Sequence, residues 1–276
     1  MTASTSFDGR VAIVTGSTQG LGEATVRLMA ERGAAGIVVV GRNGERGRAV
    51  AASLPCPAEV VVADLSEAEA PDRVVAAADA AFGRVDVLVN AAALTVRGSV
   101  WDTDAALWDR MLHLNVRAPG LLITAAAKVM ARERIAGSIV TIGSVAAHGG
   151  QDFLYPYATS KAALGTLTRN AAHALMRHRI RVNLLQPGWM ATPGEDDIQR
   201  RFHDADDCWL DRAVASRPFG RLIEPDELAR TICFLASDES GMLTGAVIDF
   251  DQSVIGAGDA PVPTLDPTWG EPSWGS

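Results

Sequence analysis

Cysteine and positive charge are both scarce in this chain of 276 residues. Only 3 cysteines are present, and their odd number and wide spacing fit neither a disulfide framework nor a zinc site, so we expect a reducing cytosol and no bound metal. The 25 Lys and Arg residues are outnumbered by 33 Asp and Glu residues, which leaves a net charge of −8. This balance argues against a nucleic-acid groove and against a polybasic membrane surface.

Long apolar segments are missing as well. No run approaches the ~20 apolar residues that a membrane-spanning helix needs. The N-terminal segment, MTASTSFDGR, is polar and lacks the apolar core of a secretory signal. These absences favour an acidic globular protein in the cytoplasm, with neither membrane nor nucleic acid among its partners.

The sequence does contain an alternation of short apolar runs with longer, alanine-rich stretches of helical length. The runs are rich in β-branched residues and apolar nearly throughout, which is typical of strands buried on both faces. They cover Val11–Thr15, Ile37–Val40, Val60–Ala63, Val85–Val89, Ser138–Ile142, Arg181–Leu185 and Ala246–Phe250. The alternation predicts an α/β fold: a single doubly wound, Rossmann-like domain with a seven-stranded parallel sheet and helices on both faces.

Two segments depart from this alternation. Residues 188–224 are polar and irregular and follow the sixth run, so they emerge at the carboxyl edge of the sheet, where ligands of such folds bind. We expect short helices there, which form either a lid or a plain surface insertion. Residues 256–276 form a Pro-, Gly- and Trp-rich tail outside the domain of residues 1–255. This tail either crosses the surface or docks on a neighbouring subunit through Trp269 and Trp274.

The first apolar run leads directly into a glycine-rich turn, TGSTQGLG, and then into an apparent helix. Glycine permits a tight turn and a close approach of the backbone to a pyrophosphate, and the free N–H groups of the helix start attract an anion. No Gly-Lys-Ser/Thr follows, so the turn is not the phosphate loop of an NTPase. It predicts a dinucleotide site with the candidate residues Gly16, Thr18, Gln19, Gly20, Leu21 and Gly22.

The ends of the next two runs bear on the choice of dinucleotide. An acidic residue about 20 positions after the glycines normally binds the ribose 2′-hydroxyl of NAD, but this chain carries Arg42 there. A guanidinium matches a 2′-phosphate, which favours NADP with NAD still usable, unless Arg42 is an ordinary surface arginine. Asp64, followed by Leu65, closes the third run and either faces the adenine or caps the next segment.

A candidate catalytic group follows the fifth run. Tyr157 and Lys161 are four residues apart in a stretch of helical composition, and this spacing places them on one helix face. The ammonium of Lys161 favours the phenolate of Tyr157 and lowers its pKa from the ordinary value of ~10. Ser144 lies just past the fifth run, at the same carboxyl edge, where its hydroxyl can hold a substrate oxygen.

With these motifs the chain resembles the short-chain dehydrogenase/reductase family over roughly residues 7–252. The glycine turn matches TGxxxGxG, Ser144 stands at the family's distance before the YxxxK motif, and Asn115 matches the catalytic asparagine. The resemblance implies that Tyr157 is the general acid/base, that Lys161 also binds the ribose, that Ser144 orients the substrate oxygen and that Asn115 anchors a proton-relaying water. It also implies a homotetramer.

Further positions match the family in part. Asn90, Pro187, Gly188 and Thr192 correspond to residues that contact its cofactor. The usual Asn-Asn-Ala-Gly, however, is Asn90-Ala91-Ala92-Ala93 here, and the usual Asp-Gly-Gly is Asp251-Gln252-Ser253. Gly41 stands where NAD-dependent members usually carry aspartate, so NADP is not excluded.

The expected reaction is hydride transfer between NADP or NAD and a secondary alcohol or ketone. The candidate substrate contacts are Ser144, His148, Gln151, Phe153 and Trp189, with Leu94 as a further wall residue. Their polarity and the acidic loop suit a sugar or polyol, with a bulkier apolar ketone (a steroid or a 3-oxoacyl thioester) as the alternative. A non-catalytic dinucleotide sensor is a third possibility, but such a protein needs only the glycine turn and not the catalytic set.

Overall fold

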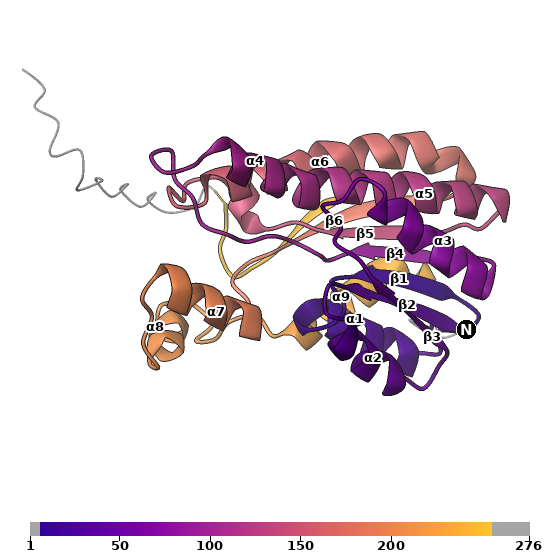
Figure 1. Ribbon diagram of the computed structural model, residues 1–276, viewed down its shortest axis with the longest axis horizontal. Helices are drawn as coiled ribbons and strands as arrows, with labels where there is room; N and C mark the ends of the chain where they lie inside the picture. Colours follow the sequence, from indigo (N-terminus) through magenta and orange to yellow (C-terminus); the bar gives the residue numbers. More distant parts are fainter. Residues whose placement is uncertain (1–5, 256–276) are drawn as a thin grey trace, which may run out of the picture.

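The computed structural model describes residues 6–255 (Figure 1), so the expectation about Trp269 and Trp274 concerns residues outside the described range. The described chain forms one sheet of seven parallel strands in the order β3-β2-β1-β4-β5-β6-β7, which confirms the predicted architecture. The strands are β1 (Val11–Thr15), β2 (Gly36–Gly41), β3 (Ala58–Val62), β4 (Val87–Asn90), β5 (Ser138–Ile142), β6 (Arg181–Pro187) and β7 (Val247–Phe250).

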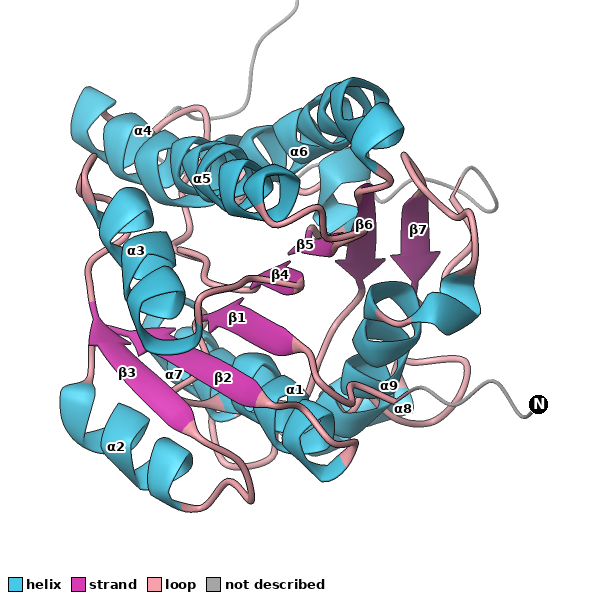
Figure 2. Ribbon diagram, turned by 90° about the vertical axis from the view of Figure 1, so that its right-hand side faces the viewer, coloured by secondary structure: helices cyan, strands magenta, loops and turns pink. Residues whose placement is uncertain are grey.

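Helices cover both faces of the sheet (Figure 2). On one face lie α3 (Ala70–Phe82), α4 (Ala105–Leu112), α5 (Ala118–Arg132) and α6 (Tyr155–Leu175). On the other face lie α1 (Gly20–Glu31), α2 (Gly44–Ala52) and α9 (Pro225–Ala236). The expected doubly wound α/β arrangement is therefore present.

Side chains of the central strands alternate between two hydrophobic cores. Ile13 of β1 and Leu88 of β4 pack with residues of α3 and α5. The next residues along these strands, Val14 and Val89, pack on the opposite face with residues of α1 and α9. All four side chains are fully buried. Because both faces of each strand are covered, the strand sequences are apolar throughout rather than alternating with polar residues.

The site is positioned by the reversal of strand order at β1. This strand pairs with β2 on one side and with β4 on the other. The chain then leaves β1 toward α1 on one face of the sheet and leaves β4 toward α4 on the opposite face (Figure 2). A crevice opens at such a switch point, beyond the carboxyl ends of the strands.

The irregular segment 188–224 contains the expected short helices. They are α7 (Pro193–Phe202) and α8 (Trp209–Ala215), which extend beyond the body of the domain (Figure 1). Trp209 and Leu222 form a small separate core with Trp189 packed against it. The side chain of Thr192 caps α7 by accepting a hydrogen bond from the backbone N–H of Glu195 at 3.1 Å.

Neither a membrane span nor a metal cluster occurs in the part of the chain that the structure describes. No helix in residues 6–255 is long and apolar enough to cross a membrane. Over the same range, no group of three or more His, Cys, Asp or Glu side chains is placed to hold a metal ion.

Candidate active site

A cavity of about 840 Å³ lies at the carboxyl ends of the strands. The loops after β1, β2, β3, β4, β5 and β6 all contribute to its walls, together with α6 and α7. It thus brings together most of the residues that the sequence singled out. The predicted residues that line it are Gly16, Thr18, Gln19, Gly20, Leu21, Gly22, Arg42, Asp64, Leu65, Ser144, Gln151, Phe153, Tyr157, Lys161, Pro187, Gly188, Trp189 and Thr192.

The glycine turn has a shape that side chains would prevent. Gly16 has φ +68°, and a Cβ there would lie 2.9 Å from the backbone of Ala92. A Cβ on Gly22 would lie 2.3 Å from the carbonyl oxygen of Gly16. Gln19 precedes α1 without capping it through its side chain, so N–H groups of the first turn remain available to an anion. The turn therefore fits the pyrophosphate of a dinucleotide.

Residues 90–93 differ from the Asn-Asn-Ala-Gly that is usual in the family that the chain resembles, but hydrogen bonds still fix the loop after β4. The hydroxyl of Thr15 accepts hydrogen bonds from the backbone N–H groups of Ala91 and Ala92 at 3.0 and 3.1 Å. Asn90 donates through Nδ2 to the hydroxyl of Thr141 at 3.3 Å, and its buried Oδ1 has no partner among the described residues. Asn90 does not line the cavity, so its contact with a cofactor stays a prediction.

The end of the cavity near α2 carries positive charge from two elements. Exposed Arg42 follows β2 and lines the cavity. The side chain of Arg46, which the sequence did not single out, donates through Nη1 to Oε1 of Gln19 in the glycine turn at 2.5 Å. Asp64 lines the cavity and also accepts hydrogen bonds from the N–H and hydroxyl of Ser66 at 2.9 and 2.7 Å. Both roles considered for Asp64 are therefore compatible with its position.

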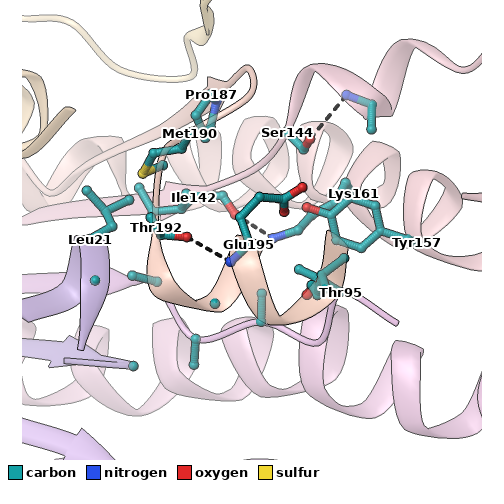
Figure 3. A pocket seen from close by; sticks show the side chains of 18 of the residues that line it. Leu21, Thr95, Ile142, Ser144, Tyr157, Lys161, Pro187, Met190, Thr192 and Glu195 are labelled. Carbon is teal, nitrogen blue, oxygen red and sulfur yellow. Dashed lines mark hydrogen bonds between the residues drawn. The ribbon is translucent and has the colours of Figure 1, made fainter. Parts of the chain in front are cut away.

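Tyr157, Lys161 and Ser144 converge on the middle of the cavity (Figure 3). Tyr157 and Lys161 lie in α6, and the Lys161 ammonium donates to the carbonyl oxygen of Ile142 at 2.8 Å. Burial lowers the pKa of Lys161 to about 8. The Ser144 hydroxyl, at the end of β5, accepts a hydrogen bond from the N–H of Ala146 at 3.1 Å. The predicted catalytic trio is thus assembled in one place.

The hydroxyl of Tyr157 has a raised pKa in this structure, because burial disfavours the phenolate. A hydrogen bond with Ser144 and the charge of Arg97 oppose this increase, whereas Glu195 adds to it. The expected lowering by Lys161 is not among these influences. That role of Lys161 stays a prediction for the cofactor-bound protein.

Asn115 lies behind the cavity wall rather than in it. It belongs to a π-helical turn, His113–Arg117, between α4 and α5. Such turns are rare and often mark functional sites. Its Nδ2 donates to the carbonyl oxygen of Leu94 at 2.9 Å, and its Oδ1 accepts from the N–H of Leu94 at 2.8 Å. Asn115 therefore fixes the loop after β4, and its water-anchoring role is a prediction that the structure leaves open.

The structure does not bring His148 to the cavity. This side chain is absent from the lining residues, and its Nε2 lies 3.0 Å from a carboxylate oxygen of Asp249 in β7. Gln186 in β6 donates to the same carboxylate at 2.7 Å. The expected contact of His148 with the substrate therefore has no support from its position, because the turn after β5 directs the ring toward the far strands. Leu94 is also absent from the lining.

A charged part of the cavity wall, which no sequence motif reveals, lies within electrostatic reach of Tyr157. Arg97 comes from the loop after β4, and Glu195 comes from the first turn of α7. Both line the cavity together with Gln199 and His203. These residues follow no recognisable motif, and they meet only because α7 lies across the end of the sheet.

Comparison with known proteins agrees with this geometry. The model of the family described as enoyl-(acyl carrier protein) reductase matches residues 16–253. L-rhamnose 1-dehydrogenase from Azotobacter vinelandii is 37% identical, over 88% of this chain and 95% of that protein. A 3-alpha-(or 20-beta)-hydroxysteroid dehydrogenase from Mycobacterium bovis is 34% identical, over 90% of each chain.

A solved structure extends the likeness to the fold. The 3-oxoacyl (acyl-carrier-protein) reductase from Agrobacterium tumefaciens with NADP bound is 26% identical, with a TM-score of 0.80 over 89% of this chain and 94% of that chain. Sequence and fold similarity thus extend over nearly the whole domain, and the family model spans both the glycine turn and Tyr157. The chain belongs to the short-chain dehydrogenase/reductase family and is an oxidoreductase.

Proposed function

We propose that the protein transfers a hydride between a nicotinamide dinucleotide and the carbon of a secondary alcohol or ketone. The observation that carries this proposal is the convergence of Ser144, Tyr157 and Lys161 on the cavity that the glycine turn also lines. A non-catalytic dinucleotide sensor would need the turn alone. The presence of a proton-transfer group inside the same cavity therefore favours an enzyme.

The chain's own groups supply binding and proton transfer. The turn at Gly16–Gly22 would hold the pyrophosphate, Lys161 the nicotinamide ribose, and Pro187 and Gly188 the nicotinamide side of the cavity. When bound, the dinucleotide supplies or accepts the hydride. In oxidation, the Tyr157 phenolate takes the proton of the substrate hydroxyl, and in reduction the neutral phenol returns it. Ser144 holds the same substrate oxygen in place.

The lining on the substrate side favours a polyhydroxylated substrate such as a sugar. Gln151, Glu195 and Gln199 offer polar groups, and the ring of Trp189, which stacks on Trp209 at 6.1 Å, lines the cavity beside them. A steroid or a 3-oxoacyl thioester would leave Oε2 of Glu195, which accepts no hydrogen bond from residues 6–255, without a partner, and this is costly for a mostly buried carboxylate. The test is a panel of sugars, polyols, steroids and ketoesters with each dinucleotide, followed by nicotinamide absorbance. A clear preference for steroids or ketoesters would refute the polyol proposal.

We expect a modest preference for NADP, because Arg42 lines the cavity and the guanidinium of Arg46 is hydrogen-bonded to Gln19 in the glycine turn. A charge-assisted contact with a 2′-phosphate contributes ~1.5–3 kcal/mol, or roughly 10- to 150-fold in preference. Replacing both arginines by glutamine should remove most of this preference. The measurement is the ratio of kcat/KM for the two dinucleotides. Arg48→Gln, which removes an exposed charge from the same helix but not the charge bonded to Gln19, is the matched control.

Reversing the preference for NADP requires three substitutions. An aspartate at Gly41 would add a repulsion against the 2′-phosphate, but its Cβ would lie 2.5 Å from the methyl group of Thr18. Thr18→Ser removes that methyl, so Gly41→Asp should be combined with Thr18→Ser and Arg42→Ile. A wild-type protein that already strongly favours NAD would refute the proposed role of both arginines.

We propose that residues 188–224 act as a lid. Contacts with the body hold α7 in place: Arg97 donates through Nε to His203 at 3.1 Å, and the His203 and Phe153 rings meet edge to face at 5.2 Å. Trypsin should cut at Arg200 or Arg201 in the free protein, and dinucleotide with substrate should slow that cut several-fold, because closure orders the segment. Equal cleavage with and without ligands, identified by mass, would instead indicate a plain surface insertion.

We also propose that the protein is a homotetramer in the cytoplasm. Exposed Leu112 on α4 and Leu121 on α5 give the outer helical layer an apolar surface that a second copy can cover. The three cysteines are all free, which suits a reducing compartment.

A further inference from the structure

Arg97 and Glu195 form an unusual charge pair in the wall of the cavity. Nη2 of Arg97 lies 3.6 Å from Oε1 of Glu195, and the two side chains are only 15% and 18% exposed. This distance exceeds that of a hydrogen bond. The two charges are therefore close and mostly shielded from solvent, yet neither uses the other as a hydrogen-bond partner.

Each member of the pair is instead held by its own neighbours. Oε1 of Glu195 accepts from Nε1 of Trp189 at 2.8 Å and from Nε2 of Gln199 at 2.7 Å. Arg97 donates through Nε to His203 at 3.1 Å, and its guanidinium lies 5.5 Å from the centre of the Phe153 ring. Both charged groups are thus held in the cavity wall by their own neighbours, without a hydrogen bond between them.

This arrangement leaves one acceptor atom and one donor atom of the pair without a short hydrogen bond. Among residues 6–255, Oε2 of Glu195 accepts no hydrogen bond, and Nη2 of Arg97 has only the long contact with Glu195. Figure 3 shows the Glu195 carboxylate pointing into the part of the cavity that the Tyr157 hydroxyl faces. Both charges also act on the Tyr157 pKa, in opposite directions, so both lie within electrostatic reach of the reacting position.

We propose that Arg97 and Glu195 together bind a hydroxyl group of an uncharged polyhydroxylated substrate, adjacent to the carbon that reacts at Tyr157. A hydroxyl is both donor and acceptor, so it donates to Glu195 while it accepts from Arg97. An anionic substrate group would be attracted by Arg97 but repelled by Glu195. A cationic group would be attracted by Glu195 but repelled by Arg97. The inference rests on the proposed oxidoreductase function and assigns the residues that select the substrate.

The chain offers a closely matched pair of variants. Glu195→Gln removes the charge and retains a carbonyl acceptor for Trp189. Asp196→Asn removes the neighbouring charge from the same turn of α7, where the carboxylate accepts from Nε1 of Trp209 at 2.7 Å in the same manner. Asp196 does not line the cavity. The two variants therefore differ chiefly in whether the lost charge faces the substrate.

The readout is a ratio: kcat/KM for a polyol divided by kcat/KM for the matched alcohol that lacks the adjacent hydroxyls, each oxidised with NADP. A hydrogen bond to a charged group is worth roughly 10- to 150-fold. Glu195→Gln should lower the ratio by about that factor, mainly through KM for the polyol, and Arg97→Met should do the same. Asp196→Asn should keep the wild-type ratio.

Three results would overturn the inference and leave the oxidoreductase function standing. The first is a wild-type ratio near one, and the second is an equal fall of the ratio in Asp196→Asn. The third is a rise of kcat/KM for the corresponding hydroxy acid in Glu195→Gln that exceeds, as a fold-change, the fall of kcat/KM for the polyol. The last result would identify Arg97 as the anchor of an anionic substrate. Failure of the proposed function itself is distinguishable, because the wild-type protein would then oxidise neither alcohol.

Discussion

Tyr157→Phe should lower kcat by about 10²- to 10⁴-fold, the range expected when a general acid/base is removed. The change deletes one hydroxyl and keeps the ring, which lies 5.8 Å from the Lys161 ammonium. The Kd of the dinucleotide should therefore remain within about twofold of the wild-type value. Stopped-flow turnover with equilibrium binding separates these two effects.

The chain contains a matched control for this variant, because it has only 2 tyrosines. Tyr155 lies in the same turn of α6 but is 45% exposed and packs edge to face against Trp108 at 5.3 Å. Tyr155→Phe should therefore leave turnover unchanged. If Tyr157→Phe retained more than about a tenth of wild-type turnover, Tyr157 would not be the proton-transfer group.

Gly22→Ala should damage both the stability of the fold and the binding of the dinucleotide. The added Cβ would lie 2.3 Å from the carbonyl oxygen and 2.7 Å from the carbonyl carbon of Gly16, and backbone atoms cannot rotate away as a side chain can. Overpacking of this kind costs ~1–3 kcal/mol. For a chain of this size, that lowers Tm by roughly 2–4 °C for each kcal/mol. Because the turn must shift, dinucleotide Kd should rise about tenfold or more.

A glycine-to-alanine substitution in α6 should instead raise the stability of the fold. Gly165 lies within α6, where the nearest atom to an added Cβ is Nη1 of Arg169 at 3.8 Å. Gly165→Ala should stabilise the protein by ~0.5–1 kcal/mol, because glycine loses more conformational freedom in a helix than alanine does. Thermal melts and dinucleotide titrations of both variants test the prediction. Unchanged binding in Gly22→Ala would contradict the assignment of the turn.

The sheet was predictable because burial on both faces leaves a strong local signal. The expected runs at Val11–Thr15 and Ser138–Ile142 coincide with β1 and β5. Helices with weaker local signals were harder to place. α2 has the sequence GERGRAVAA, in which glycine and charge hide any helical pattern, and no local pattern predicts that the turn His113–Arg117 is π-helical.

Site residues were likewise predictable only where they belong to one short sequence motif. The glycine turn and the pair Tyr157 and Lys161 each lie within one short segment, so spacing alone revealed them. Arg97 and Glu195 come from distant segments that meet only when α7 is placed. His148 was predicted as a polar wall residue for a sugar or polyol, but its ring lies against Asp249, which comes a hundred residues later in β7.

The central claim is that Tyr157 moves a proton as the substrate carbon exchanges a hydride, and the pH dependence of both directions tests it most directly. The measurement is kcat/KM for alcohol oxidation and for ketone reduction between pH ~6 and 8; Lys161, with a pKa of about 8, is largely protonated over most of this window. Oxidation should rise with pH, by up to tenfold per unit, because it needs the phenolate, whereas reduction should not rise. In Tyr157→Phe this dependence should vanish. An oxidation rate that is independent of pH in the wild-type protein, or the same slope in Tyr157→Phe, would contradict the account.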